Sequence, residues 1–143
     1  MDFIGRNNMD YQEYVHRAQQ ASELMGSSRL QETVDFLYLL FLSDISDIDK
    51  AGICANLATV YDRMGNTESA ISWYDKGIDL EQIYCRFEVS EKKAQYLSQL
   101  GRSKEAVPIY ETLIKQPFIS EADRERMRKT IQILLGQTTR QWK

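Results

Sequence analysis

The sequence is poor in residues that interrupt helices and in residues that hold metals. Two prolines and seven glycines in 143 residues are too few for a loop-rich or disordered chain. One histidine and two cysteines provide no His/Cys metal cluster, no Ser-His-Asp set and no redox pair. The sequence therefore predicts a chain that is not an enzyme and that has no metal or cofactor site.

Long apolar runs and an excess of charge are also missing. The longest unbroken apolar run, residues 36–42, is far shorter than a membrane span, and the first residues lack the apolar core of a secretory signal. The formal net charge is −3, and the basic residues are interleaved with acids, which gives no surface suited to nucleic acid. We therefore predict a cytoplasmic chain that binds neither membranes nor nucleic acid, with Cys54 and Cys85 as free thiols.

What the sequence does contain is a repeat. Residues 51–84 align with residues 87–120 at an offset of 36 positions. The coinciding pairs are Ala58 and Ala94, Gly65 and Gly101, Ala70 and Ala106, and Tyr74 and Tyr110. A fainter copy lies in residues 14–46, where both the glycine and the aromatic residue are replaced. Self-similarity at this period is typical of stacked helical hairpins.

Cap and turn residues divide the chain into seven expected helices. Asp10, Ser46 and Ser120 supply side-chain oxygens that can accept backbone N–H groups at helix starts. Gly65 and Gly101 favour the left-handed conformation that ends a helix, and a new helix cap follows each of them. No segment shows sustained alternation of apolar and polar residues, so we predict no strand.

The central copy closely resembles the tetratricopeptide repeat. It reads Cys54-x-x-Leu57-Ala58-x-x-Tyr61, followed by Gly65, Ala70 and Tyr74. In such a repeat the small residues Ala58 and Ala70 let two antiparallel helices approach closely, and larger apolar residues fill the space around the crossing. Cys54 and Ser90 depart from the pattern, because the family usually has tryptophan there.

The resemblance implies an all-α fold, an α-solenoid of about three tetratricopeptide-like hairpins with a C-terminal capping helix. We expect the capping helix to run from Ser120 to about Leu135. The helical domain is expected over residues 10–136, between an N-terminal tail at 1–9 and a C-terminal tail at 137–143.

In this family the first helices of successive hairpins line a concave groove that receives an extended segment of a partner protein. The resemblance assigns this role to a polar set with several amides, which suits hydrogen bonding to a peptide backbone. The set is Ser22, Ala55, Asn56, Thr59, Arg63, Lys92, Gln95 and Gln99, with Ala18, Gln19 and Glu91 beside them. The alternative is that these residues form only the solvated faces of amphipathic helices.

One subset of the family grips the C-terminal carboxylate of heat-shock chaperones with two lysines, two asparagines and an arginine. Asn56 matches this clamp, and Lys92 stands at the place of the arginine. The other three places hold Ala18, Ser22 and Glu88. Because Glu88 would repel a carboxylate, we predict that this clamp is not formed.

A second surface is predicted from residues 34–42, which are apolar nearly all round a helix. Four of these side chains exceed what one hairpin needs, namely Phe36, Tyr38, Leu39 and Leu42. Either an N-terminal segment with Phe3 and Ile4 folds over them, or they form an interface for a partner or for a second copy in a homodimer.

The resemblance therefore implies a protein–protein interaction module, a scaffold or adaptor that binds a partner peptide in its groove. The alternative is a dedicated chaperone or assembly factor. Small bacterial secretion chaperones resemble this layout, with about three hairpins and dimerisation near the N-terminus. A further alternative is a fragment of a larger protein whose other domains carry the chemistry.

Overall fold

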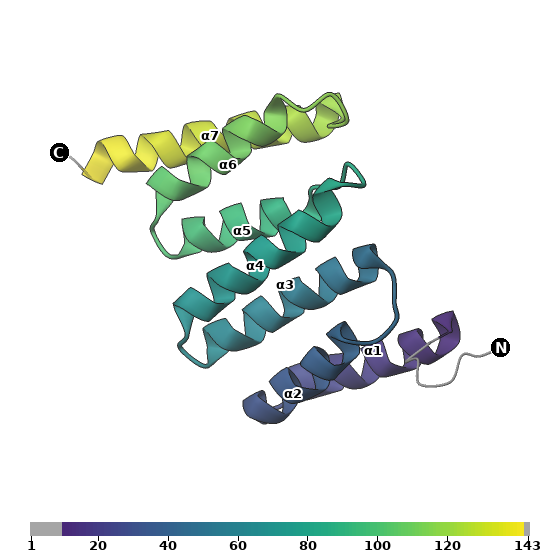
Figure 1. Ribbon diagram of the computed structural model, residues 1–143. Coiled ribbons are helices and arrows are strands. Elements are labelled where there is room, and N and C mark those ends of the chain that lie inside the picture. The colour runs from purple at the N-terminus through teal and green to yellow at the C-terminus, as the bar shows by residue number, and fades with distance from the viewer. Residues whose placement is uncertain (1–9, 142–143) are drawn as a thin grey trace. The chain divides into compact units, whose positions relative to one another are not determined.

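The computed structural model describes residues 10–141, with side chains up to residue 136 (Figure 1). The described residues form seven helices and no strand, as predicted. They are α1 (Tyr11–Met25), α2 (Leu30–Phe41), α3 (Asp47–Arg63), α4 (Thr67–Gln82), α5 (Glu88–Gln99), α6 (Ser103–Ile114) and α7 (Glu121–Gln141). The expected tail at 1–9, with Phe3 and Ile4, lies outside the described residues. Helix α7 continues to Gln141, past the expected end near Leu135.

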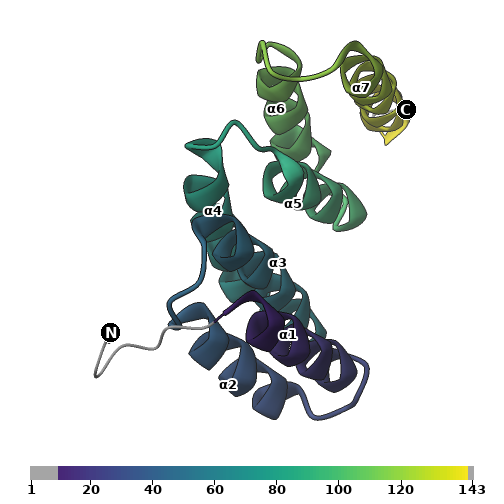
Figure 2. The same cartoon turned by 90° about the vertical axis from the view of Figure 1, so that its right-hand side faces the viewer.

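The helices divide into two compact units, with the boundary between Tyr84 and Cys85. Unit 1 holds α1 to α4, and unit 2 holds α5 to α7. Within each unit the helices pack in sequence order: α1 on α2, α2 on α3 and α3 on α4 in unit 1, and α5 on α6 and α6 on α7 in unit 2 (Figures 1 and 2). Packing between sequence neighbours is the organisation of an α-solenoid. The single helical domain expected over residues 10–136 remains a prediction.

Side-chain oxygens begin several helices, as the sequence predicts. The backbone N–H three residues further on donates to Asp10 at 2.8 Å and to Ser46, Asn66 and Ser120 at 3.1 Å. Each bond satisfies one of the N–H groups that a helix start leaves without a partner. Helix α6 has no such bond, contrary to the prediction, because the residue before Ser103 is an arginine, which has no acceptor oxygen.

Two helices end at glycines in the left-handed conformation. Gly65 after α3 has φ +79°, and Gly101 after α5 has φ +77°. In both turns the glycine N–H donates to the carbonyl three residues back, and the next N–H donates to the carbonyl five residues back. This is the Schellman pattern that the sequence predicts. Cys85, after α4, adopts the same region with φ 57°, which costs a residue with a side chain about 1–2 kcal/mol.

The first hairpin turns without a left-handed residue. Gly26 at the end of α1 has φ −78°. The Ser27 hydroxyl donates to the Leu24 carbonyl at 2.6 Å, and the Thr33 hydroxyl lies 3.1 Å from the same carbonyl and 2.7 Å from that of Arg29. Side chains thus close this turn, so Ser28, at the place of Gly65, does not adopt the left-handed conformation.

Unit 1 is built on an apolar core that its helices share. Leu37 of α2 and Leu57 and Val60 of α3 have no exposed surface. Ala58 and Ala70 are also fully buried, at the α3–α4 pairing where small residues were predicted. Burial of one such leucine or valine contributes about 1.5–3 kcal/mol, so these positions dominate the stability of the unit.

Unit 2 combines an apolar core with hydrogen bonds and ion pairs from α7. Ala94, Leu97, Ala106 and Tyr110 of α5 and α6 are buried, as the repeat predicts. Met127 of α7 is also fully buried. These side chains place α5, α6 and α7 in register with one another.

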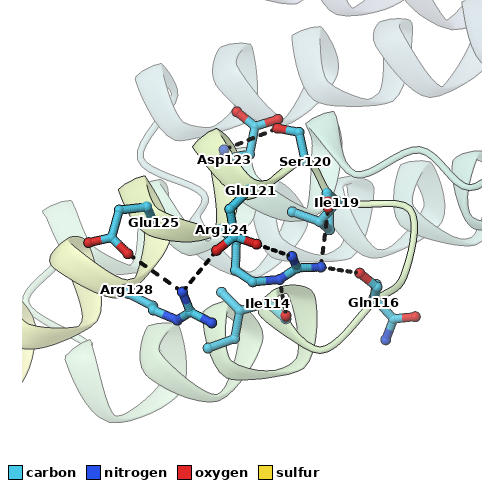
Figure 3. A network of polar contacts seen from close by, with 9 residues as sticks. All are labelled: Ile114, Gln116, Ile119, Ser120, Glu121, Asp123, Arg124, Glu125 and Arg128. Atoms are coloured by element: carbon cyan, nitrogen blue, oxygen red, sulfur yellow. Dashed lines mark hydrogen bonds and ion pairs between the residues drawn. The ribbon is translucent and has the colours of Figure 1, made fainter.

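Arg124 fixes the approach of α7 to α6 (Figure 3). Its guanidinium donates to the backbone carbonyls of Ile114 at 2.8 Å, Gln116 at 3.0 Å and Ile119 at 3.2 Å, and it pairs with Glu121 at 2.8 Å. These carbonyls belong to the end of α6 and the loop after it, where no helical N–H can reach them. The Gln116 carbonyl also accepts from the Ile119 N–H at 3.2 Å, so the arginine is its second donor, and it supplies a donor to the Ile114 and Ile119 carbonyls as well.

Candidate protein interaction surfaces

The residues predicted to line a groove in unit 1 fall into two groups. The first group faces outward: Ser22 of α1 is exposed, and Asn56 of α3 is half-buried. Neither side chain hydrogen-bonds to another residue in the part of the chain that the structure describes. The donors and acceptors of these two side chains are therefore not used within the described residues.

The second group in unit 1 is used internally. Ala55 is buried and offers almost no surface. The Thr59 hydroxyl donates to the Ala55 carbonyl at 3.1 Å and shares a hydrogen bond with Tyr74. Arg63 donates to the backbone carbonyl of Met25 at the end of α1. Thr59 and Arg63 thus stabilise the unit, and changing them would disturb its packing as well as any binding.

Unit 2 presents a continuous polar row on α5. Lys92, Gln95 and Gln99 are exposed, and their spacing of three and four residues puts them on one face of the helix. No side chain in the described residues pairs with them. Two primary amides and an ammonium group on one face can donate and accept hydrogen bonds along an extended peptide.

Glu91, beside this row, forms an ion pair within unit 2. Its carboxylate pairs with Arg126 of α7, which also pairs with Asp123 at 3.0 Å. Hydrogen bonds from Arg126 to Glu91 and then to Asp123 raise the pKa of the arginine. The sequence offers one sign of this contact, because Arg126 follows Glu91 by 35 positions, which is close to the repeat offset of 36.

The positions of the chaperone clamp hold no cluster of cations. Ala18 is half-buried and apolar, and Glu88 is exposed and lies 3.7 Å from Arg86. Of the five positions, Asn56 and Lys92 carry matching chemistry, one in each unit. That this clamp is not formed remains a prediction, which is based on the negative charge of Glu88.

Helix α2 carries the second predicted surface. Tyr38, Leu39 and Leu42 are 45%, 67% and 52% exposed, whereas Phe36 is half-buried against the unit 1 core. Three of the four predicted side chains are thus available on the outside of unit 1.

An aromatic cluster supports this row of side chains. The rings of Phe41 and Trp73 meet edge to face with centroids 5.4 Å apart, and Tyr38 contacts both of them at 6.4 and 6.1 Å. The Lys50 ammonium lies 5.6 Å from the centre of the Phe41 ring, and the Lys76 ammonium of α4 lies 5.3 Å from that of Trp73. We name Tyr38, Leu39, Leu42, Phe41 and Trp73, with these two lysines, the aromatic face. Sequence reasoning missed both lysines, because α3 and α4 bring them in from later in the chain.

A hollow of about 370 Å³ lies in unit 1 beside the start of α3. It is lined by Tyr11, Tyr14, Asp44, Ile45, Ser46 and Asp49. Burial, and then the charge of Asp49, raise the pKa of Tyr14. The carboxylates lie near a helix N-terminus, where the helix dipole stabilises them without a ligand.

The two cysteines lie in different surroundings. Cys54 is buried in unit 1, and burial raises the pKa of its thiol to about 12. Cys85 is exposed at the unit boundary. The described residues contain no group of three or more His, Cys, Asp or Glu side chains arranged to hold a metal ion. None of the helices in this part of the chain has the length and apolar character that a membrane crossing requires.

Comparison with known proteins identifies the two central hairpins. Residues 51–84 and 88–116 each match the family model of the tetratricopeptide repeat. The first match covers α4 and most of α3, and the second covers α5 and α6. No curated protein matches the chain.

Proposed function

Because residues 51–84 and 88–116 match the model of the tetratricopeptide repeat, we propose that this chain is a scaffold or adaptor that binds an extended segment of another protein. Tetratricopeptide repeats generally mediate protein–protein interactions, and the family is a non-enzymatic repeat family. In this proposal the chain acts by binding and not by catalysis, and it works in the cytoplasm. The segment lies on the first helix of each hairpin, where the groove of this family is formed.

The observation that carries the proposal is the row of Lys92, Gln95 and Gln99 on α5. Three polar side chains on one helix face, without partners among the described residues, are what hydrogen bonding to a peptide backbone needs. Asn56 of α3 supplies a further amide in unit 1. The internal bonds of Thr59 and Arg63 leave Asn56 as the amide that unit 1 offers, and unit 2 offers the row on α5.

The test is affinity capture from the native source with three versions of the chain. The wild type is compared with a variant carrying Asn56→Ala and Lys92→Ala, and with a control carrying Glu111→Ala on the exposed side of α6. We expect a partner that the wild type and the control recover and the double variant loses. Equal recovery by all three versions would contradict the proposed surface.

A second candidate function is a dedicated chaperone or assembly factor. The exposed apolar side chains of Leu39 and Leu42 favour it, because a chaperone must shelter apolar segments of its client. The two functions differ in the state of the partner. An unstructured partner that aggregates without the chain indicates a chaperone, and a folded complex that falls apart without it indicates an adaptor.

A further inference from the structure

The aromatic face has a row of exposed apolar side chains that unit 1 does not use. Leu39 lies in the last turn of α2, Leu42 follows the helix directly, and Tyr38 adjoins Leu39. Each leaves about half or more of its surface exposed, whereas Leu37 of α2 is fully buried in the core. An apolar row with this exposure marks a surface for another molecule.

The base under this row is held in place before any ligand arrives. Phe41 and Trp73 pack against the unit 1 core and against each other edge to face, and Tyr38 rests on both. Aromatic pairs in this geometry contribute about 0.5–1.5 kcal/mol beyond the area they bury. Because α2 and α4 both supply rings, the row is fixed relative to α4 as well as to its own helix.

Two lysines set the charge of the aromatic face. Lys50 and Lys76 lie over the Phe41 and Trp73 rings, and neither forms an ion pair within the described residues. The acids of α2 lie toward its other end and are already engaged, Glu32 with Arg29 at 2.7 Å and Asp35 with the Gln31 amide at 3.0 Å. Asp47 and Asp49 stand near Lys50 on α3, and Asp75 and Asp79 stand near Lys76 on α4, but no ion pair joins either lysine to them in the described residues. The apolar row is therefore bordered by two ammonium groups that pair with no carboxylate of the described chain.

The size of the row decides between a second copy and a short segment. Three exposed side chains are few beside the roughly 20–30 residues that each partner contributes to a stable interface. A homodimer through this row alone would be too small to persist. A segment that inserts two or three apolar side chains matches the number of side chains in the row.

We propose that the aromatic face binds a short amphipathic segment of another protein, with apolar side chains on Leu39 and Leu42 and carboxylates paired with Lys50 and Lys76. This surface is separate from the polar row of the proposed function, and it shares no residue with it. Carboxylates that meet lysines beside an apolar contact give specificity, because a basic segment would be repelled there.

The test is a differential selection from a random peptide library displayed on phage. The full chain and its Leu39→Gln variant are used as targets, with Ile133→Gln as the matched control, since Ile133 is an exposed apolar residue of α7. We expect peptides that bind the wild type and the control but not Leu39→Gln, and these should carry Asp or Glu beside Leu, Ile or Phe. Leu42→Gln serves as an independent variant, and circular dichroism verifies that each variant remains helical.

A selected peptide is then titrated against charge variants. We expect Lys50→Glu and Lys76→Glu each to weaken binding by about tenfold, and Lys129→Glu on α7 to leave it unchanged. Asn56→Ala should also leave it unchanged, which separates this surface from the proposed function.

Several results would overturn the proposal. They are the absence of any Leu39-dependent peptide, an excess of Lys and Arg in the selected peptides, and self-association of the chain that Leu39→Gln abolishes. Binding that occurs only when residues 1–9 are deleted would also overturn it, because the chain's own segment would then be the occupant.

Discussion

Both units combine buried apolar side chains with an arginine that donates to backbone carbonyls, but this arginine lies in different parts of the chain. In unit 1 the helices share fully buried side chains such as Leu57, and Arg63 of α3 donates to the Met25 carbonyl of α1. In unit 2 Met127 of α7 is fully buried, and Arg124 donates to carbonyls at the end of α6 and in the loop after it. The arginine lies within the matched repeat in unit 1 and beyond it in unit 2, so the repeat pattern predicts apolar burial but not where such an arginine binds. Four predictions sharpen or break this comparison.

The largest expected effect is on the reactivity of the two thiols. With a pKa of about 12, Cys54 is a thiolate in about one molecule in ten thousand at pH 8, and its side chain is buried. We expect a thiol reagent to modify Cys85 at least about a thousandfold faster than Cys54 in the native chain. Mass spectrometry of timed samples measures both rates, and denaturant should make them similar. Comparable rates without denaturant would show that the unit 1 core opens readily.

The next largest effect is on the apolar core of unit 1. Leu57→Ala removes a side chain with no exposed surface and leaves a cavity, so we expect a loss of about 3 kcal/mol in the free energy of unfolding. Leu39→Ala, at an exposed position, should change it by less than about 0.5 kcal/mol. Urea denaturation measures both variants. Equal losses would refute the assignment of the core.

Arg124→Met tests the polar tie of unit 2. The variant keeps much of the apolar stem but leaves the carbonyls of Ile114, Gln116 and Ile119 without the guanidinium, so we expect a loss of about 2 kcal/mol. Arg128→Met is the matched control, because Arg128 pairs only with exposed carboxylates. Hydrogen exchange should become faster in α7 and stay unchanged in α3. Faster exchange in both helices would contradict the prediction that Arg124 acts only on the attachment of α7.

The smallest effect concerns two left-handed residues. Cys85→Gly relieves a strained φ and should stabilise the chain by about 1 kcal/mol. Gly65→Ala puts a side chain at φ +79° and should destabilise it by a similar amount. Thermal unfolding should therefore move in opposite directions for the two variants. Shifts of the same sign would contradict the reading of Cys85 as strained.

The repeat positions could be predicted from the sequence because each follows from local geometry. Gly65 ends a helix because a left-handed turn favours glycine, and Ala58 is small because two helices cross there. The N-caps at Asp10, Ser46 and Ser120 are equally local. Such signals lie within a few residues of the feature they specify.

The rest depends on contacts between distant residues. Thr59 and Arg63 were predicted for the groove, but their internal bonds reach Tyr74 and Met25 on other helices. Lys76 reaches the aromatic face from α4, and Arg124 finds backbone carbonyls that no side-chain pattern reveals. Periodicity gives the face of a helix on which a residue lies, but not the neighbour it meets there.

Site-specific crosslinking tests the central claim, partner binding on the first helices, most directly. A photoreactive amino acid replaces Gln95 on α5 or, as a control, Glu111 on α6, and the chain is irradiated in its native source. We predict a crosslinked partner protein at position 95 and none at position 111. A partner crosslinked equally at both positions, or only at position 111, would contradict the claim.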